Sequence, residues 1–356
     1  MDVRKGMPSP QLDRDEFKQR FLQRFFDPAF ETVKDELDRI AEIAWDGYHN
    51  GRKAPRTVKA GPAFADPSYD LSIEWLEAHR AIQAAQRRHD DPSALPRILI
   101  INGATRSEHT CPGEMSKTWR IVTLARDIIE TSGGTECEVL DLSRLASEYG
   151  RKIYPCKTCV STAMPLCHWP CSCYPNHSLG QASDWMNEIY PLWVAAHGVM
   201  IVCPVNWYQA PSSLKLMIDR LVCADGGNPD PTSTSGKDPL KAKALELKGW
   251  DYPRHLAGRV FSVVVHGDAA GAENLRRILS DWMQDIGLVP SGHLSMLDRY
   301  VGYLAPYATS HDDLDADTDF QEDVRNAARA LVQAVKDRRS GKLDPSDRGL
   351  HEPRPK

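Results

Sequence analysis

Apolar residues along the chain fall either into short unbroken runs or into stretches with helical spacing. The run 199–202 has no polar alternation, which is typical of a parallel strand buried on both faces, and the largely apolar segments 97–101 and 260–265 are predicted strands as well. The segments 137–142 and 287–297 complete a set of five predicted strands. Between the strands, apolar residues recur every three or four positions, so one face of each predicted helix packs on the sheet. The pattern predicts an α/β fold in which strands and helices alternate.

The first 95 residues precede this alternation and have a pattern of their own. Phenylalanines at every fourth position from Phe17, followed by aliphatic residues over 33–44, predict two amphipathic helices separated near Pro28, and a third helix is predicted around Trp75. The Gly-, Pro- and Lys/Arg-rich stretch 50–68 predicts a linker, and 223–259 a long connection. The predicted parts are a helical extension over 1–95, a main domain over 96–340 with a cysteine-rich insertion over 155–175, and a disordered tail over 341–356.

Composition excludes several classes of protein. The chain has 356 residues, of which 41% are hydrophobic, enough for a sizeable core, and its net charge of −5 gives no basic field for nucleic acid. No apolar run approaches the roughly 20 residues of a membrane helix, and the first ten residues lack a signal-peptide core. We therefore expect a cytoplasmic protein with no nucleic-acid or membrane partner. In such a chain, nine cysteines suggest metal or redox chemistry.

Two strand ends are candidate ligand sites. The strand 199–202 ends at Pro204, and a polar and aromatic loop leads from there to a helix that begins near Pro211. The strand 97–101 ends in Asn-Gly-Ala-Thr-Arg-Ser, and a helix begins near Ser116. In an open parallel sheet, ligands bind at the carboxyl ends of the strands, and a loop of this composition before a helix N-terminus suits a phosphate.

Five cysteines lie within eighteen residues, which is the most unusual feature of the sequence. They are Cys156, Cys159, Cys167, Cys171 and Cys173. Thiolates this close can share an iron–sulfur cluster or a zinc ion, for which His168 or His177 are substitute ligands. A metal-free redox pair is the third alternative, although thioredoxin-type motifs open a helix directly after a strand and this one does not.

The sequence Pro-Val-Asn-Trp-Tyr-Gln followed by Ser-Leu-Lys-Leu-Met-Ile-Asp-Arg resembles the flavin-ring loop and following helix of the NAD(P)H-dependent FMN reductases, a flavodoxin-like family. The resemblance covers about 97–339. It implies a three-layer sandwich with a five-stranded parallel sheet of order 2-1-3-4-5, with FMN at the carboxyl edge and NAD(P)H as electron donor. It also implies a homodimer or homotetramer.

The resemblance assigns cofactor-binding roles residue by residue. Those implied for the FMN phosphate are Gly103, Thr105, Arg106, Ser107, Ser116 and Thr118, with Lys117 as an added charge. Those implied along the flavin ring are Pro204, Val205, Asn206, Trp207, Tyr208 and Gln209, and a third loop adds His266, Gly267, Asp268 and Gly271. No amino acid is assigned a catalytic role, because N5 of FMN is the reactive centre. The phosphate loop departs from the family in being lengthened by 108–115.

Within this family the cysteine segment resembles that of the iron–sulfur flavoproteins, whose compact motif also falls between the second and third strands. The resemblance implies Cys156, Cys159, Cys167 and Cys173 as cluster ligands, with Cys171 as the alternate. The spacing departs from the family, because seven residues separate Cys159 from Cys167.

The function implied is an FMN-dependent NAD(P)H oxidoreductase that passes electrons through an iron–sulfur cluster to a quinone, flavin, metal or redox-protein acceptor. Three alternatives remain open. They are a one-electron carrier flavoprotein, a two-electron quinone or flavin reductase with a structural zinc in the cysteine loop, and a flavin-dependent binding module without turnover. The sequence identifies neither the acceptor nor the preferred nicotinamide nucleotide.

Overall fold

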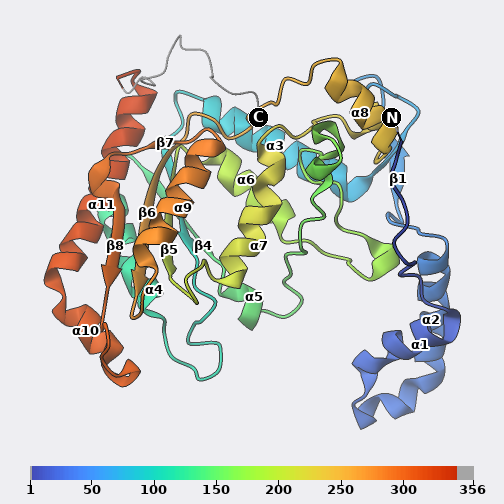
Figure 1. Ribbon diagram of the computed structural model, residues 1–356, viewed down its shortest axis with the longest axis horizontal. Helices are drawn as coiled ribbons and strands as arrows, with labels where there is room; N and C mark the ends of the chain where they lie inside the picture. The colour runs from blue at the N-terminus through green and yellow to red at the C-terminus, as the bar shows by residue number, and fades with distance from the viewer. Residues whose placement is uncertain (1, 343–356) are drawn as a thin grey trace. The chain divides into compact units, whose positions relative to one another are not determined.

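The computed structural model describes residues 2–342 (Figure 1). Their contacts group the chain into two units, which we describe separately. The first unit comprises Met1–Glu77, Lys157–Asp184 and Asn228–Asp251, and the second, here called the sheet unit, comprises Ala78–Cys156, Trp185–Gly227 and Tyr252–Lys356. The division predicted from the sequence, with a boundary near residue 95, stays a prediction. Residues 343–356 of the predicted tail lie outside the described part of the chain.

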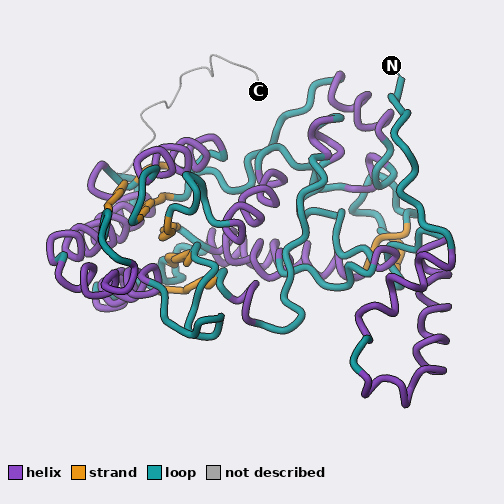
Figure 2. The backbone as a smooth tube through the Cα atoms, turned by 60° about the horizontal axis from the view of Figure 1, so that its bottom comes forward, coloured by secondary structure: helices purple, strands orange, loops and turns teal. Residues whose placement is uncertain are grey.

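The sheet unit contains a parallel sheet, drawn as orange strands in Figure 2. Its strands are β3 (Arg97–Asn102), β4 (Glu136–Asp141), β5 (Gly198–Pro204), β6 (Val260–Gly267), β7 (Val289–Pro290) and β8 (Met296–Tyr300). The order is β4-β3-β5-β6, and both β7 and β8 pair with β6. This confirms the predicted flavodoxin-like order 2-1-3-4-5, with one difference, which is that the fifth strand is split. Gly292, at a φ of 124°, and a short 3-10 turn at His293–Ser295 interrupt it.

Helices cover both faces of this sheet (Figure 1). Helices α4 (Lys117–Thr131) and α11 (Thr318–Arg339) share one core cluster with alternate residues of the strands, such as Ile98 and Ile100. Helices α6 (Met186–Ala195) and α9 (Ala272–Asp285) pack together through Trp193 and Trp282, whose ring centroids are 6.0 Å apart. Helix α7 (Ser212–Arg220) adjoins α6, because Tyr190 Oη donates to the carbonyl of Arg220. The shorter helices α5 (Arg144–Ser147) and α10 (Ser310–Ala316) complete the unit.

The first unit is mainly helical and irregular. The two helices predicted around Pro28 are α1 (Arg14–Leu22) and α2 (Lys34–His49), and the third is α3 (Ile73–Asp90), whose residues fall in both units. Helix α8 (Pro239–Leu247) lies within the long connection predicted over 223–259. The predicted linker contains part of a two-stranded antiparallel sheet, β1 (Thr57–Lys59) and β2 (Asp70–Ser72). Three-residue strands are too short for a periodic pattern to reveal them.

No helix among residues 2–342 is long and apolar enough to cross a membrane.

Candidate functional site

Three loops that the sequence singled out follow the ends of three neighbouring strands. Strand β5 lies between β3 and β6, and the register pairs Asn102 with Val202 and Pro204 with His266. The loops that begin at Gly103, at Pro204 and after His266 therefore leave the same carboxyl edge of the sheet. This is the edge at which open α/β sheets bind ligands.

The first loop is packed tightly against the neighbouring strand and helix. The N–H of Gly103 donates to the carbonyl of Val202 over 2.8 Å, and a Cβ on Gly103 would lie 2.7 Å from the Cβ of Cys203. Only glycine fits there without displacing the core. The loop is also tied to α7, because the hydroxyls of Thr105 and Ser213 lie 3.0 Å apart.

A cavity of about 140 Å³ lies at this edge. A larger cavity, of about 480 Å³, is lined by residues of the first unit and is described below. The smaller cavity lies where the first loop meets the N-terminus of α4, whose cap Ser116 accepts a hydrogen bond from the N–H of Trp119 over 3.1 Å. It is lined by three of the predicted phosphate residues, Arg106, Ser107 and Ser116, together with Asn102, Glu108, His109, Met115, Trp119 and Asp141. Its volume equals that of four or five water molecules at about 30 Å³ each, which is room for a phosphate group. Arg106 forms an ion pair with Glu114 of the inserted stretch 108–115.

The side chain of His266 joins α4 to β6 beneath the third loop. It is 2% exposed, and its Nε2 lies 2.8 Å from the Thr118 hydroxyl. Burial, aided by the charge of Lys117, lowers the pKa of His266 to about 3, so the ring is neutral at physiological pH. Lys117 in turn lies 3.3 Å from the carboxylate of Asp268. These contacts engage the side chains of four predicted site residues in fixing the loop on the sheet.

The middle loop forms a two-residue turn that the sequence did not reveal. Asn206 and Gln209 exchange backbone hydrogen bonds of 2.9 and 3.0 Å, and between them Trp207 and Tyr208 have φ angles of 48° and 65°. Such turns usually carry Asn-Gly, because the left-handed region costs other residues about 1–2 kcal/mol each. A Trp-Tyr pair therefore gives no turn signal.

Glycines of the third loop let it approach this turn closely. A Cβ on Gly267 would lie 2.4 Å from Cγ1 of Val205, and one on Gly271 would lie 3.0 Å from Cδ1 of Tyr208. Gly271 also has a φ of 113°, which disfavours any other residue. Its N–H and that of Ala272 donate to the Tyr300 hydroxyl, which is thus a further residue of the site that the sequence analysis missed.

The cysteine segment is distributed over both units. Cys156 belongs to the sheet unit, and the other four cysteines belong to the first unit. The Sγ atoms of Cys159 and Cys173 lie 3.5 Å apart. Within residues 2–342, no group of three or more His, Cys, Asp or Glu side chains converges in a way that could hold a metal ion. The cluster or zinc ligands predicted for this segment stay a prediction.

Two lysines accompany these thiols, and sequence reasoning missed both. Lys237 Nζ lies 3.7 Å from Cys159 Sγ and donates to the carbonyl of Leu166 over 2.7 Å. Burial by itself lowers the pKa of Lys237, but the thiol groups of four cysteines outweigh burial and raise it. Lys53 donates to the carbonyl of Ser172, and burial lowers its pKa. The sequence did not reveal these contacts because the partners are far apart along the chain. Lys237 is 78 positions from Cys159, and Lys53 is 119 positions from Ser172.

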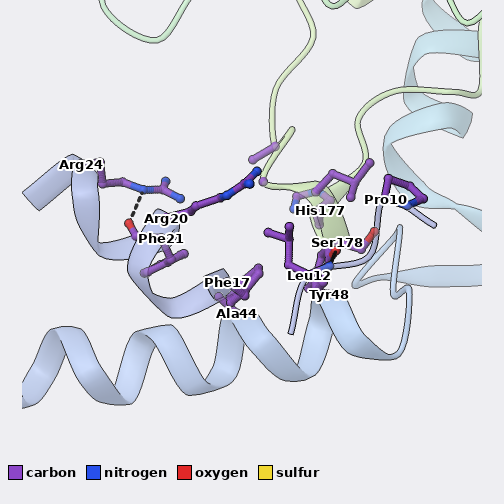
Figure 3. Close-up of a pocket in the computed structure, with 13 residues that line it drawn as sticks. Pro10, Leu12, Phe17, Arg20, Phe21, Arg24, Ala44, Tyr48, His177 and Ser178 are labelled. Carbon is purple, nitrogen blue, oxygen red and sulfur yellow. Dashed lines mark hydrogen bonds between the residues drawn. The ribbon is translucent and has the colours of Figure 1, made fainter. Parts of the chain in front are cut away.

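The larger cavity lies in the first unit, between α1, α2 and the 3-10 turn His177–Leu179 (Figure 3). Aromatic side chains of Phe17, Phe21 and Tyr48 form part of its wall, and Arg24 lies over the ring of Phe21 at 4.4 Å. His177, predicted as a substitute zinc ligand, lines it, whereas the five cysteines of the segment and the residues with predicted flavin roles do not.

The chain is similar to known flavoproteins. The profile of the family "NADPH-dependent FMN reductase" matches residues 96–298. Among solved structures, RosB with the bound intermediate 8-demethyl-8-formylriboflavin-5'-phosphate is 14% identical, with a TM-score of 0.47, over 70% of this chain and 82% of that one. A flavone reductase is 16% identical, with a TM-score of 0.38, over 68% and 63%. The azoreductase AzrA is 11% identical, with a TM-score of 0.36, over 67% and 99%.

No curated protein sequence matches the chain significantly. The family profile covers more than half of the chain and includes all three loops at the carboxyl edge. The chain therefore belongs to the NADPH-dependent FMN reductase family and is an NAD(P)H-dependent FMN oxidoreductase.

Proposed function

We propose that FMN binds on the three loops at the carboxyl edge of the sheet and that the enzyme reduces a small-molecule acceptor, a quinone or a flavin, with NAD(P)H. One observation carries the location. The first, middle and third loops leave adjacent strands β3, β5 and β6, and glycines at 103, 267 and 271 allow them to pack closely. The small cavity at the N-terminus of α4 supports the position of the phosphate.

In this proposal the chain binds and orients the cofactor. The phosphate lies at the N-terminus of α4, where the first-turn N–H groups have no intrahelical partner and the helix dipole favours an anion. The side chains of Arg106, Ser107 and Ser116 line that cavity and supply a cation and two hydroxyls. Bound FMN would supply the chemistry for hydride transfer from NAD(P)H and for the passage of two electrons to the acceptor.

The middle loop has a second task, which is to border the flavin ring. Val205 and Asn206 lie at the base of the turn. The N–H of Val205 donates to the carbonyl of His266, and the side chain of Val205 lies close to Gly267. Neutral His266 and its bond to Thr118 hold that base rigid. A rigid border with fixed backbone dipoles stabilises charge that develops on the ring during reduction.

The test is anaerobic reduction of FMN-loaded protein by NADPH and by NADH, followed at the flavin absorption band. The proposal expects rapid bleaching by at least one nucleotide and reoxidation by menadione or free FMN. Bound FMN that neither nucleotide reduces would favour a one-electron carrier. Reduction without turnover on any acceptor would favour a binding module.

The cysteine segment is a separate question, and the hydride reaction proposed above uses none of its residues. An iron–sulfur cluster on Cys156, Cys159, Cys167 and Cys173, with Cys171 as alternate, stays a prediction, and so does a zinc ion in the same loop. Iron and zinc analysis of anaerobically purified protein distinguishes them, because a cluster adds a broad absorption shoulder near ~400 nm and about four irons per chain. Absence of both metals would leave the thiol pair Cys159–Cys173.

We also propose a homodimer or homotetramer. Apolar side chains of α2 support an interface, since Ile40 and Ile43 are exposed. Light scattering on the purified enzyme tests the assembly, and a monomer at micromolar concentration would contradict it.

A further inference from the structure

The larger cavity of the first unit has the size and the lining of a ligand site, and the proposed function does not use it. Its volume of about 480 Å³ lies within the range of about 300–1,000 Å³ that is typical of small-molecule pockets. Most of its lining is apolar or aromatic. Among the described residues that line it, none is acidic, whereas Arg20 and Arg24 contribute two positive charges. Such a lining suits a ligand with an apolar body and a negative charge.

The aromatic wall of the cavity is held in place by the fold. The ring centroid of Phe17 lies 6.1 Å from that of Phe21 and 4.8 Å from that of Tyr48. The Tyr48 hydroxyl accepts a hydrogen bond from the N–H of Leu12 over 2.8 Å, which ties the segment before α1 to α2. Rings in a fixed arrangement favour an aromatic ligand, because a further ring gains specific offset or edge contacts with them.

A second wall of the cavity is the 3-10 turn His177–Leu179 (Figure 3). The N–H of His177 donates to the carbonyl of Lys53 over 2.8 Å, and its Nε2 lies 3.3 Å from the carboxylate of Glu74. Both contacts join the turn to distant parts of the sequence within the same unit. Tertiary structure therefore sets the two walls at a fixed separation.

Arg24 is positioned to bind an anion. It follows α1 in the 3-10 turn Gln23–Phe25, and its guanidinium lies 4.4 Å from the ring centroid of Phe21. Its Nε donates to the carbonyl of Phe21 over 3.1 Å, whereas its two terminal amino groups make no hydrogen bond within residues 2–342. Arg20 forms an exposed ion pair with Glu16, which stabilises little and can be exchanged for a ligand. Two free amino groups on a planar guanidinium match the two oxygens of a carboxylate.

We propose that this cavity binds a planar aromatic carboxylate, whose ring packs on Phe17 and whose carboxylate pairs with Arg24 and Arg20. The inference goes beyond the proposed function and does not rest on it, because no residue assigned to FMN lines the cavity. Ile40 and Ile43 of α2, which support a subunit interface, do not line it either. The cavity is thus a second ligand site, and the negative charge distinguishes its ligand from a neutral quinone.

Two changes test the charge and the space separately. The double variant Arg20→Gln, Arg24→Gln removes both charges and keeps the aromatic wall. Ala44→Leu fills the cavity from α2 with a good helix former and keeps the arginines. Arg39→Gln is the matched control, because Arg39 is a 74% exposed arginine of α2 that does not line the cavity.

The probes are 2-naphthoate, its neutral amide, and decanoate, which is an aliphatic carboxylate. Each is titrated by calorimetry into the full-length protein, with FMN in excess so that the proposed flavin site is filled. The naphthoate–amide pair isolates the charge, and the naphthoate–decanoate pair isolates the aromatic ring.

Wild type should bind naphthoate at least about tenfold more tightly than the amide, because hydrogen bonds between charged groups are worth at least that factor. It should also bind naphthoate more tightly than decanoate. The double variant should lose the preference for naphthoate over the amide, and Ala44→Leu should weaken the binding of both. Arg39→Gln should match wild type. The FMN Kd should be the same in all four proteins.

Equal affinities for naphthoate and the amide in wild type, or wild-type affinity for naphthoate in the double variant, would overturn the inference. Tighter binding of decanoate would overturn it by indicating a site for aliphatic anions. A changed oligomeric state of Ala44→Leu with unchanged naphthoate binding would also overturn it and would assign the cavity to a subunit contact. If Ala44→Leu does not fold, the double variant still decides, because both arginines are exposed.

Discussion

The carboxyl edge of the sheet and the cysteine segment are both rich in chemistry-bearing residues, yet they differ in how regular structure positions those residues. At the edge, each loop begins where a buried strand ends, so the register of β3, β5 and β6 sets the loops side by side. In the segment 155–175, only two short 3-10 turns interrupt an irregular chain. Its backbone is held by lysines that are distant in the sequence, because Lys53 donates to the carbonyl of Ser172 and Lys237 to that of Leu166.

The difference shows where sequence patterns carry positional information. A parallel sheet has a fixed spacing and direction, so the residue after each strand end has a known place. An irregular loop has no such repeat, and its geometry depends on long-range contacts. Residue types then predict possible chemistry without predicting which side chains meet.

Acid should affect the edge most strongly, through His266. Its pKa is about 3 in the folded protein, below the ordinary value of 6.5, so the unfolded chain binds the proton first as pH falls. The stabilisation that neutral His266 gives the fold is therefore fully present above about pH 6.5 and decreases below it. By pH 4 this loss lowers the free energy of unfolding by about 3 kcal/mol. Urea unfolding at pH 7 and pH 4 should show a correspondingly smaller decrease for His266→Asn than for wild type.

The control for this prediction is His109→Asn, because His109 is an exposed residue of the inserted stretch. It should show the wild-type decrease. If His266→Asn also shows the full decrease, the buried bond to Thr118 does not hold a neutral histidine.

A smaller change is expected when Gly103 is replaced by alanine. The new Cβ would lie 2.7 Å from the Cβ of Cys203 and 3.0 Å from Cδ2 of Leu214, so the first loop must shift. Overpacking of this kind costs about 1–3 kcal/mol, and the FMN Kd should rise at least about tenfold. Gly47→Ala in α2 is the matched control, because its nearest contact would be at 3.7 Å. An FMN Kd equal to that of the control would place the cofactor elsewhere.

Removing the Tyr300 hydroxyl should have a modest effect. Tyr300→Phe deletes the acceptor for the N–H groups of Gly271 and Ala272 at the start of α9. The expected loss in the free energy of unfolding is about 1 kcal/mol, as for other helix caps. Chemical denaturation measures it, and Tyr303→Phe serves as the control. A loss no larger than that of the control would show that water replaces the hydroxyl.

The smallest effect on flavin binding is expected in the cysteine segment. Cys159→Ser should leave the FMN Kd within about twofold of wild type, because the proposed flavin loops lie elsewhere in the sequence. Any bound iron or zinc should decrease in the same sample, which metal analysis detects. If Cys159→Ser also lost FMN binding, the cysteine segment would be needed for the flavin site, and the two regions would not be functionally separate.

Much of the sheet unit followed from local signals. Unbroken apolar runs predicted the strands, Ser116 predicted the start of α4, and the order of elements predicted the topology. The turn at Trp207 was missed because a Trp-Tyr pair gives no turn signal, and Gly271, whose missing side chain leaves room for Tyr208, lies far along the chain. Lys53 and Lys237 were missed for the same reason, since only tertiary contacts bring them to the thiols. The split of β7 from β8 depends on Gly292, whose positive φ has no periodic signature.

The central claim is that the FMN phosphate binds where the first loop meets α4. The most direct test compares the Kd values of FMN and riboflavin, measured by quenching of flavin fluorescence, in wild type and in an Arg106→Gln, Ser107→Ala double variant. Two charge-assisted hydrogen bonds of about 1.5 kcal/mol each predict that wild type binds FMN about 100-fold more tightly than riboflavin. The double variant should bind the two flavins with nearly equal affinity. Equal affinities in wild type, or an unchanged preference for FMN in the double variant, would contradict the account.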